Sequence, residues 1–128
     1  MTFSIKLALI IFAFAIVVDL LWLGVFASNF YKNELGSLYT KKVNFVSAIF
    51  VYLIMSIGIA FFVVGHPSVD NLKMGFYVGA FFGFTLYAVY DLTNLAVLKN
   101  YPMKMVVVDI VWGSLLGGLL GVVGKYFA

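Results

Sequence analysis

The sequence predicts an all-α integral membrane protein, a four-helix transmembrane bundle with a short interfacial helix between the first and second spans. Two observations lead to this fold class. Of the 128 residues, 65% are hydrophobic and 10% are charged, against about 45 to 50% and about 25% in soluble domains. The apolar residues also gather in four long stretches, and about 20 such residues are needed to cross a bilayer. We expect residues 1–128 to form a single transmembrane domain.

The four apolar stretches cover about residues 7–28, 43–64, 74–98 and 103–124. Each is long enough to cross roughly 30 Å of hydrocarbon at about 1.5 Å per residue. The first stretch resembles a signal peptide, but its apolar part is too long for one and contains Asp19. We therefore expect it to be retained as a membrane-spanning helix.

The connection between the first two spans, residues 29–42, has a pattern of its own. Its aromatic and leucine residues recur at near-helical spacing: Phe30, Tyr31, Leu35, Leu38 and Tyr39. Because polar residues stand between them, this pattern predicts a short amphipathic helix at the membrane interface. The other two connections are turns that contain proline, near Pro67 and Pro102.

The lysines indicate how the chain is oriented, because all eight basic residues are lysines at the ends of spans. Five belong to the side of the first and third connections: Lys32, Lys41, Lys42, Lys99 and Lys104. Three belong to the other side: Lys6, Lys73 and Lys125. The positive-inside rule then favours both termini outside the cytoplasm. The bias is small, so a dual topology stays an alternative.

The composition excludes several classes of site. The chain has no cysteine and one histidine, His66, which lies in a connection. Disulfide frameworks, thiolate chemistry, His or Cys metal clusters and a Ser-His-Asp triad are therefore excluded. The net charge of +3 comes from scattered lysines rather than a basic face, so we expect no nucleic acid partner. Nothing in the spacing demands a metal, and we expect no cofactor.

Three aspartates inside the spans are the main functional signal. Asp19, Asp91 and Asp109 each carry a cost of roughly 2.5 to 3.5 kcal/mol at a membrane centre. Counted from the nearer helix ends, all three lie on the order of 7 to 14 Å inside the same membrane boundary. The lysine bias makes this the cytoplasmic half. We therefore expect one acidic cluster in that half.

Other polar and aromatic residues share helix faces with these aspartates. On the third span, five residues fall within an arc of about 100° at helical spacing: Gly83, Tyr87, Tyr90, Asp91 and Asn94. A stripe on the first span covers about 60°: Ala8, Ala15, Asp19, Trp22 and Phe26. The pattern Asp-x-x-Trp recurs in the fourth span. The candidate ligand-binding pocket is Asp19, Trp22, Asn44, Ser47, Tyr87, Tyr90, Asp91, Asn94, Asp109 and Trp112.

Glycine tracts mark the opposite half of the membrane. The third span has glycine at every fourth position from Gly75 to Gly83, and the fourth span has it from Gly113 to Gly121. Such tracts let two helix backbones approach closely. We expect a tight seam between these two spans there, and helices that splay around the acidic half and leave a cavity.

A resemblance to a known family rests on three segments of the chain. They are Tyr90-Asp91-Leu92-Thr93-Asn94-Leu95-Ala96 and the segments that begin at Asp19 and at Asp109. Over nearly its whole length the chain resembles an uncharacterised family of small bacterial membrane proteins, known only as a domain of unknown function. The resemblance implies a multi-pass protein of the bacterial inner (cytoplasmic) membrane. It marks Asp19, Asp91, Asn94 and Asp109 as signature positions and implies no activity.

Three functions stay open at this point. The first is a pocket that binds or modifies a lipid or small apolar molecule. In its enzymatic version Asp91 acts as acid or base, Tyr87 or Tyr90 donates a proton and Asn94 orients the substrate. The second is a structural or accessory membrane subunit, whose partners are membrane lipids, another helix or a second copy in a homodimer. The third is a proton-coupled small-molecule transporter. Whether the protein is an enzyme is left undecided.

Overall fold

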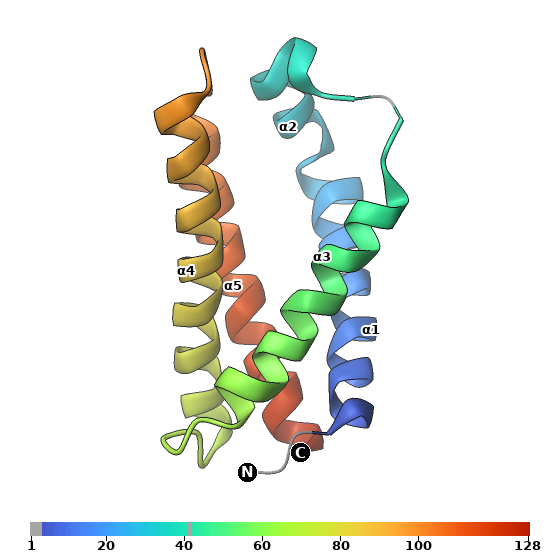
Figure 1. Cartoon of the computed structure of the whole chain (residues 1–128), viewed down its shortest axis with the longest axis vertical. Helices are drawn as coiled ribbons and strands as arrows, with labels where there is room; N and C mark the ends of the chain where they lie inside the picture. Colours follow the sequence, from blue (N-terminus) through green and yellow to red (C-terminus); the bar gives the residue numbers. More distant parts are fainter. Residues whose placement is uncertain (1–3, 41) are drawn as a thin grey trace.

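A computed structural model, which describes residues 4–40 and 42–128, shows four long helical spans in an up-and-down bundle (Figure 1). The spans are α1 (Ile5–Leu21) continued by the π-helix η1 (Trp22–Phe26), α3 (Phe45–Gly58) continued by the π-helix η3 (Ile59–Val64), α4 (Leu72–Val97) and α5 (Met103–Phe127). Each is long and apolar enough to cross a membrane, and the described residues form no strand. The predicted fold class is confirmed, with span ends at most three residues from those expected.

The spans are joined by one short helical connection and two turns. Helix α2 (Ser28–Leu35) and the 3-10 turn η2 (Gly36–Leu38) occupy the segment expected to be an interfacial helix. Gly36 ends α2 with a φ of 56°, a left-handed conformation that glycine adopts without steric cost. Lys41, one of the counted lysines, lies outside the described residues. The chain then reverses direction through the two turns, so that α1 begins and α5 ends at the same end of the bundle (Figure 1).

Three of the four spans begin at a polar residue whose side chain caps the helix. Ser4, Asn44 and Asn71 accept hydrogen bonds from backbone N–H groups three residues ahead, at 3.2, 3.2 and 2.9 Å. These contacts satisfy donors that the first helical turn leaves without an intrahelical partner. The positions of these polar residues therefore fix where the apolar spans start.

Helices α4 and α5 meet along the predicted glycine seam. Gly79 lies against Gly117 so closely that a Cβ on either residue would overlap the carbonyl oxygen of the other. A Cβ on Gly75 or on Gly83 would likewise overlap the carbonyl oxygen of Gly121 or of Gly113. The absence of side chains thus brings the two backbones together, as in other membrane helix pairs. The structure confirms this seam.

Helix α3 diverges from the α4–α5 pair. Its backbone packs on that of α1, whereas the backbones of α4 and α5 are approached by its continuation η3. Figure 1 shows α3 crossing the bundle obliquely, near α4 at the end of the chain termini and far from it at the α2 end. The large apolar core accordingly lies in the half away from α2: Leu7, Ala8, Ile11, Ala15, Met55, Ile59, Ala60, Val63, Leu116 and Leu120.

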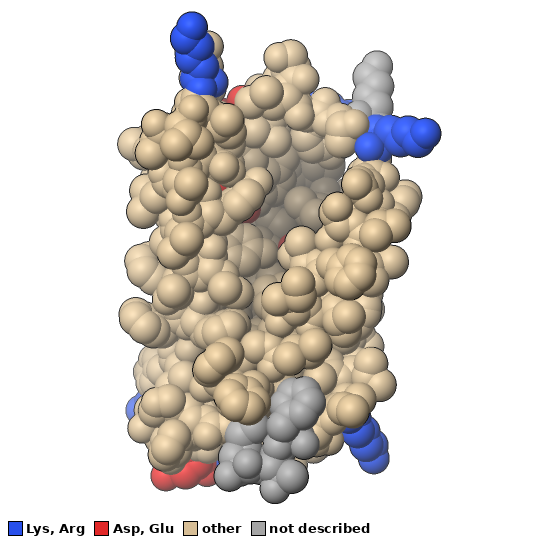
Figure 2. Space-filling view, in the orientation of Figure 1, with Lys and Arg blue, Asp and Glu red and all other residues tan. Residues whose placement is uncertain are grey.

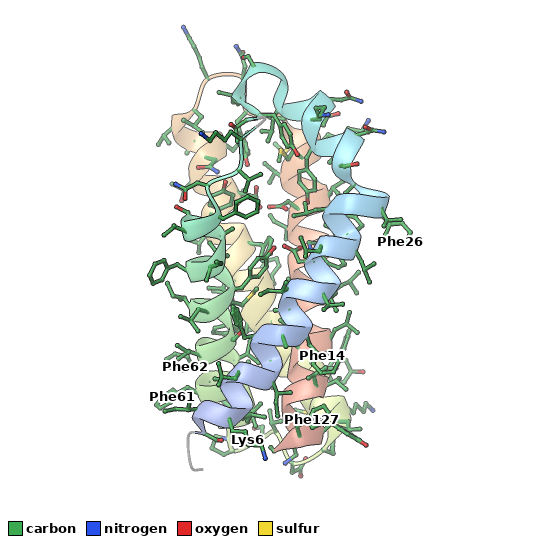
Figure 3. All side chains as sticks on the ribbon, turned by 90° about the vertical axis from the view of Figure 1, so that its right-hand side faces the viewer. Lys6, Phe14, Phe26, Phe61, Phe62 and Phe127 are labelled. Carbon is green, nitrogen blue, oxygen red and sulfur yellow. The ribbon has the colours of Figure 1, made fainter. Side chains whose placement is uncertain are left out.

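The outer surface is apolar over the length of the spans. Figure 2 shows basic side chains at the two ends of the molecule and an uncharged flank between them. Figure 3 shows Phe61 and Phe62 at the periphery, and Phe14 of α1 beside Phe127 of α5, with ring centroids 6.0 Å apart. Exposed aromatic rings of this kind are suited to a lipid environment.

One expected helix stripe is broken by the π-helix η1. Phe26 was expected on the same face as Asp19 and Trp22, but it is 76% exposed and points away from the bundle (Figure 3). A π-turn closes its hydrogen bonds over one residue more than an α-turn, which rotates the residues that follow. Trp22, at the start of η1, keeps its inward place, and the expectation for Phe26 is wrong.

Candidate functional site

Asp19 of α1 is held by donors from two other spans. The Tyr52 hydroxyl of α3 donates a hydrogen bond of 2.5 Å to one carboxylate oxygen. The Trp112 indole N–H of α5 donates one of 2.9 Å to the other. Asp19 is buried, with 8% of its surface exposed. Both oxygens are therefore satisfied by neutral donors, which offsets part of the cost of a carboxylate in the membrane.

Two tryptophans connect Asp19 to Asp109. The Trp22 and Trp112 rings stack with centroids 4.5 Å apart and planes 7° from parallel. The Trp22 indole N–H donates to the Tyr31 hydroxyl at 3.1 Å, and that hydroxyl donates to Asp109 at 2.8 Å. The two aspartates thus belong to one connected network that joins α1, α2, α3 and α5.

Asp91 of α4 is the most buried member of the cluster, with none of its surface exposed. Its Oδ1 accepts a hydrogen bond of 3.1 Å from the Tyr101 hydroxyl, which itself accepts one of 3.4 Å from Asn94. No hydroxyl, amide or backbone group among the described residues donates a hydrogen bond to its Oδ2. The Asp109 carboxyl is close enough to form a side-chain hydrogen bond with Asp91 when one of the two carboxyls holds a proton. A buried carboxyl oxygen whose neighbour is a second carboxyl is uncommon in folded proteins.

Two tyrosines outside the spans bind these aspartates and stay protonated at neutral pH. Burial raises the pKa of Tyr31 above its ordinary value, the charge of Asp109 raises it further, and the hydrogen bond from Trp22 acts in the opposite direction. Burial likewise raises the pKa of Tyr101, as does the charge of Asp91. Both hydroxyls therefore serve as donors to carboxylates, the role that the hydrogen bonds assign to them.

Tyr87 of α4 lies beside this network. Its ring covers Gly113, where any Cβ would overlap it, and the charges of Asp19 and Asp109 act on its hydroxyl. Among the described residues, no hydrogen-bond partner of that hydroxyl is found. Tyr87 thus supplies an aromatic wall at the point where the glycine seam ends and the acidic half begins.

The surface is hollowed beside the cluster. Figure 2 shows a hollow between α3 and α4, toward the α2 end, with acidic atoms visible inside it. Its position agrees with the course of α3, which approaches α4 at the last residue of α3, Gly58, and through η3. The hollow opens sideways, toward the region that lipid occupies around a spanning bundle, whereas the other half is filled by the apolar core.

The residues expected at the site are found in two places. Seven lie in or beside the network: Asp19, Trp22, Tyr87, Asp91, Asn94, Asp109 and Trp112. Tyr90, by contrast, is 61% exposed. Asn44 and Ser47 are exposed at the start of α3, where the Asn44 side chain caps the helix by accepting from the Ser47 N–H. The structure therefore does not bring these three to the carboxylates.

Three tyrosines that bind the aspartates were not among the expected site residues. Tyr31 and Tyr101 lie in connections, where aromatic residues usually mark the interface, and Tyr52 lies in the middle of an apolar span. A signal was present, because a buried carboxylate requires donors and tyrosine is the longest neutral one. Helical spacing alone does not reveal which tyrosine of another element reaches it.

Two other concave regions lie at the opposite end of the bundle. A groove of about 610 Å³ between η3 and α4 is lined by Phe62, Val63, His66, Tyr77, Val78, Phe81, Phe82 and Thr85. A smaller one, of about 410 Å³, lies near Lys6 and Lys125. Neither contains an expected site residue, and the larger has few polar groups to orient a ligand.

The chemistry available at the cluster is that of hydrogen-bond acceptance. Among the described residues, no group of three His, Cys, Asp or Glu side chains is close enough to hold one metal ion. The carboxylates instead accept hydrogen bonds from one indole and three tyrosine hydroxyls. A site of this kind can hold a molecule that offers a donor or a positive charge.

Comparison with known proteins gives a family and no activity. The model of the family described as "Predicted membrane protein (DUF2177)" matches residues 4–126. No curated protein and no solved structure matches the chain. The match covers all four spans and the whole aspartate network.

Proposed function

We propose that this chain, which belongs to the DUF2177 family of predicted membrane proteins, binds an amphiphilic molecule of the bilayer, with the polar end of that molecule against the aspartate cluster. One observation carries the proposal. Asp91 is fully buried, and one of its oxygens receives no hydrogen bond from a hydroxyl, amide or backbone group of the described residues; it lies in the half of the bundle that is hollowed between α3 and α4 (Figure 2).

The sideways opening supports a ligand that arrives from the membrane. Because α3 leaves α4 above η3, the hollow faces lipid rather than the end of the bundle. A molecule with an apolar chain can therefore enter without leaving the bilayer. The glycine seam and the apolar core fill the interior of the other half, and the groove between η3 and α4 has few polar groups to bind a head group. We therefore place the ligand in one leaflet.

The lining supports a molecule with two kinds of surface. The stacked pair of Trp22 and Trp112 and the ring of Tyr87 present apolar area together with polar edges. Asp19 and Asp109 lie beside these rings as buried carboxylates, each with 8% of its surface exposed. Sites for small molecules combine such aromatic walls with a few converging polar groups.

The lysines support a place in the cytoplasmic half. Lys32, Lys42, Lys99 and Lys104 are exposed at the α2 end, against three described lysines at the other end. Cytoplasmic connections of membrane proteins carry an excess of lysine and arginine. We therefore place the hollow in the inner leaflet of the bacterial cytoplasmic membrane.

Mass spectrometry of co-purifying molecules tests this function. Wild type, Asp91→Asn and Asp70→Asn are purified in a mild detergent and compared at equal helix content. Both variants lose one carboxylate, but Asp70 is exposed in the connection between η3 and α4. We expect wild type and Asp70→Asn to retain the same amphiphile and Asp91→Asn to lose it, because asparagine replaces one acceptor oxygen of the carboxyl by an NH2 group, which only donates.

Two other results would contradict this proposal and favour a different function. If none of the three proteins retains a molecule, while Asp91→Asn unfolds at a lower temperature, the network serves only to hold the helices of an accessory subunit together. If nothing is retained but the protein moves a small solute in response to a pH gradient, the aspartates serve a transporter.

A further inference from the structure

We infer that the polar end of the bound amphiphile is an organic cation, an amine or a quaternary ammonium group. This inference rests on the proposed function and names the chemical class of its ligand. It begins from the charge of the site. Apart from the contact between the carboxyls of Asp91 and Asp109, the hydrogen bonds that the three aspartates receive from described residues come from neutral tyrosines and a tryptophan.

The chain brings no positive charge of its own to the cluster. All lysines among the described residues lie near the ends of the spans, and those at the α2 end are exposed: Lys32, Lys42, Lys99 and Lys104. Neutral donors lower the cost of a buried carboxylate, but they leave its charge in place. Negative charge without a counter-ion, in a site that is open to the membrane, favours a cationic ligand.

The orientation of the donors disfavours an anionic head group. The Trp22 N–H already points at Tyr31, the Trp112 N–H at Asp19 and the Tyr101 hydroxyl at Asp91. A phosphate or carboxylate would find these donors turned away and carboxylates in their place. Such an anion would be repelled and would leave its own oxygens unsatisfied.

The shape of the site favours an organic cation over a metal ion. Asp91 and Asp109 lie close together, but among the described residues no third His, Cys, Asp or Glu joins them as the ligands of one metal ion would. The stacked Trp22 and Trp112 rings lie between the hydrogen bonds that serve Asp19 and Asp109. Tryptophan is the aromatic residue that binds organic cations best, through the negative face of its ring. A spread of carboxylates around two indoles therefore suits a cation of several atoms.

Tryptophan fluorescence offers a direct test, because the only two tryptophans of the chain are Trp22 and Trp112. Three probes share a dibrominated stearyl chain, whose bromines quench tryptophan on contact, and differ only in the head: amine, alcohol or carboxylic acid. Each is titrated into wild type in uncharged maltoside micelles. We expect saturable quenching by the amine at a concentration at least about tenfold lower than by the alcohol, since a charged hydrogen bond is the stronger one.

Two variants test whether the preference for the amine head depends on the aspartate cluster. Asp109→Asn keeps an oxygen that can accept from Tyr31 but removes the charge, and Asp70→Asn removes an exposed charge elsewhere. The preference for the amine should disappear in Asp109→Asn and persist in Asp70→Asn. The comparison of the three heads on wild type needs no variant, so the test stands even where Asp109→Asn does not fold.

The failures of the two proposals differ in this experiment. Saturable quenching that is equal for amine and alcohol, or strongest for the acid, overturns the cationic head and leaves amphiphile binding in place. Quenching that rises without saturation for all three probes overturns both the cationic head group and amphiphile binding. It would show that the brominated stearyl chains only collide with the protein surface and bind no site.

Discussion

The Tyr31 hydroxyl donates a hydrogen bond of 2.8 Å to Asp109, which ties the short helix α2 to the span α5. The same hydroxyl accepts from Trp22, at the start of η1. Tyr31 therefore joins the end of the first span, the connection that follows it and the last span. The acidic half of the bundle is thus held together by a residue that lies outside the spans.

Removing the Tyr31 hydroxyl should lower stability at neutral pH. Tyr31→Phe leaves Asp109 without its donor and Trp22 without its acceptor, so we expect a loss of about 1 to 3 kcal/mol in the free energy of unfolding. The folded state raises the pKa of Tyr31, so its stabilising effect is complete below the unfolded pKa of about 10 and falls as the pH rises above it. The difference between wild type and Tyr31→Phe should therefore shrink between about pH 8 and about pH 11.

Circular dichroism of unfolding in detergent at several pH values measures this difference. Burial also raises the pKa of Tyr101, so Tyr31→Phe still loses some stability as the pH rises, although less than wild type does. A difference that stays constant across the alkaline range would mean that the Tyr31 hydroxyl does not hold its proton in the fold.

The hydrogen bond of Tyr52 should also be visible in stability. Tyr52→Phe keeps the ring and removes one of the two donors to Asp19, so we expect unfolding to become easier by about 1 to 3 kcal/mol. Tyr126→Phe is the control, because Tyr126 is exposed near the end of α5 and should change stability by less than about 0.5 kcal/mol. Equal effects of the two substitutions would argue against the contact with Asp19.

The glycine seam gives a prediction about packing. A Cβ at Gly79 would overlap the carbonyl oxygen of Gly117, so Gly79→Ala must push α4 and α5 apart and should destabilise by about 1 to 3 kcal/mol. Gly24→Ala is the matched control, since no atom lies within 4 Å of a Cβ there. The control should be neutral or slightly stabilising. Equal thermal unfolding of both variants would show that the two helices are not in contact at Gly79.

The orientation in the membrane can be measured by labelling, because the chain has no cysteine. Ser37 of η2 and Ser68 between η3 and α4 are both exposed, at opposite ends of the bundle. With an impermeant thiol reagent on intact cells, we expect Ser68→Cys to react and Ser37→Cys to react only after lysis. The reverse pattern would place the aspartate cluster in the outer leaflet, and labelling of both would indicate a dual topology.

The number of spans and the glycine seam could be predicted from the sequence, because both depend on local patterns. Long apolar runs define the spans, and a glycine at every fourth position defines a face. Counting residues along each span also predicts that Asp19, Asp91 and Asp109 lie in the same half of the membrane. These features need no knowledge of how the helices turn relative to each other.

The partners of the aspartates depend on that relative rotation, and there the sequence reasoning fell short. The π-turn after Leu21 moved Phe26 out of the expected stripe. Tyr52 reaches Asp19 from another span, α3, which packs on α1. Tyr90 is next to Asp91 in the sequence, but on a helix one residue of separation places its side chain on another face.

Photocrosslinking tests the central claim, that a bilayer amphiphile occupies the hollow between α3 and α4, most directly. A stearylamine with a diazirine next to its head is activated in membranes that contain wild type, and the modified peptides are mapped by mass spectrometry. The account predicts saturable adducts on α3 and α4 around Tyr52 and Tyr87, which unlabelled stearylamine displaces. Adducts spread over outward residues such as Phe14 and Phe26, without competition, would contradict it.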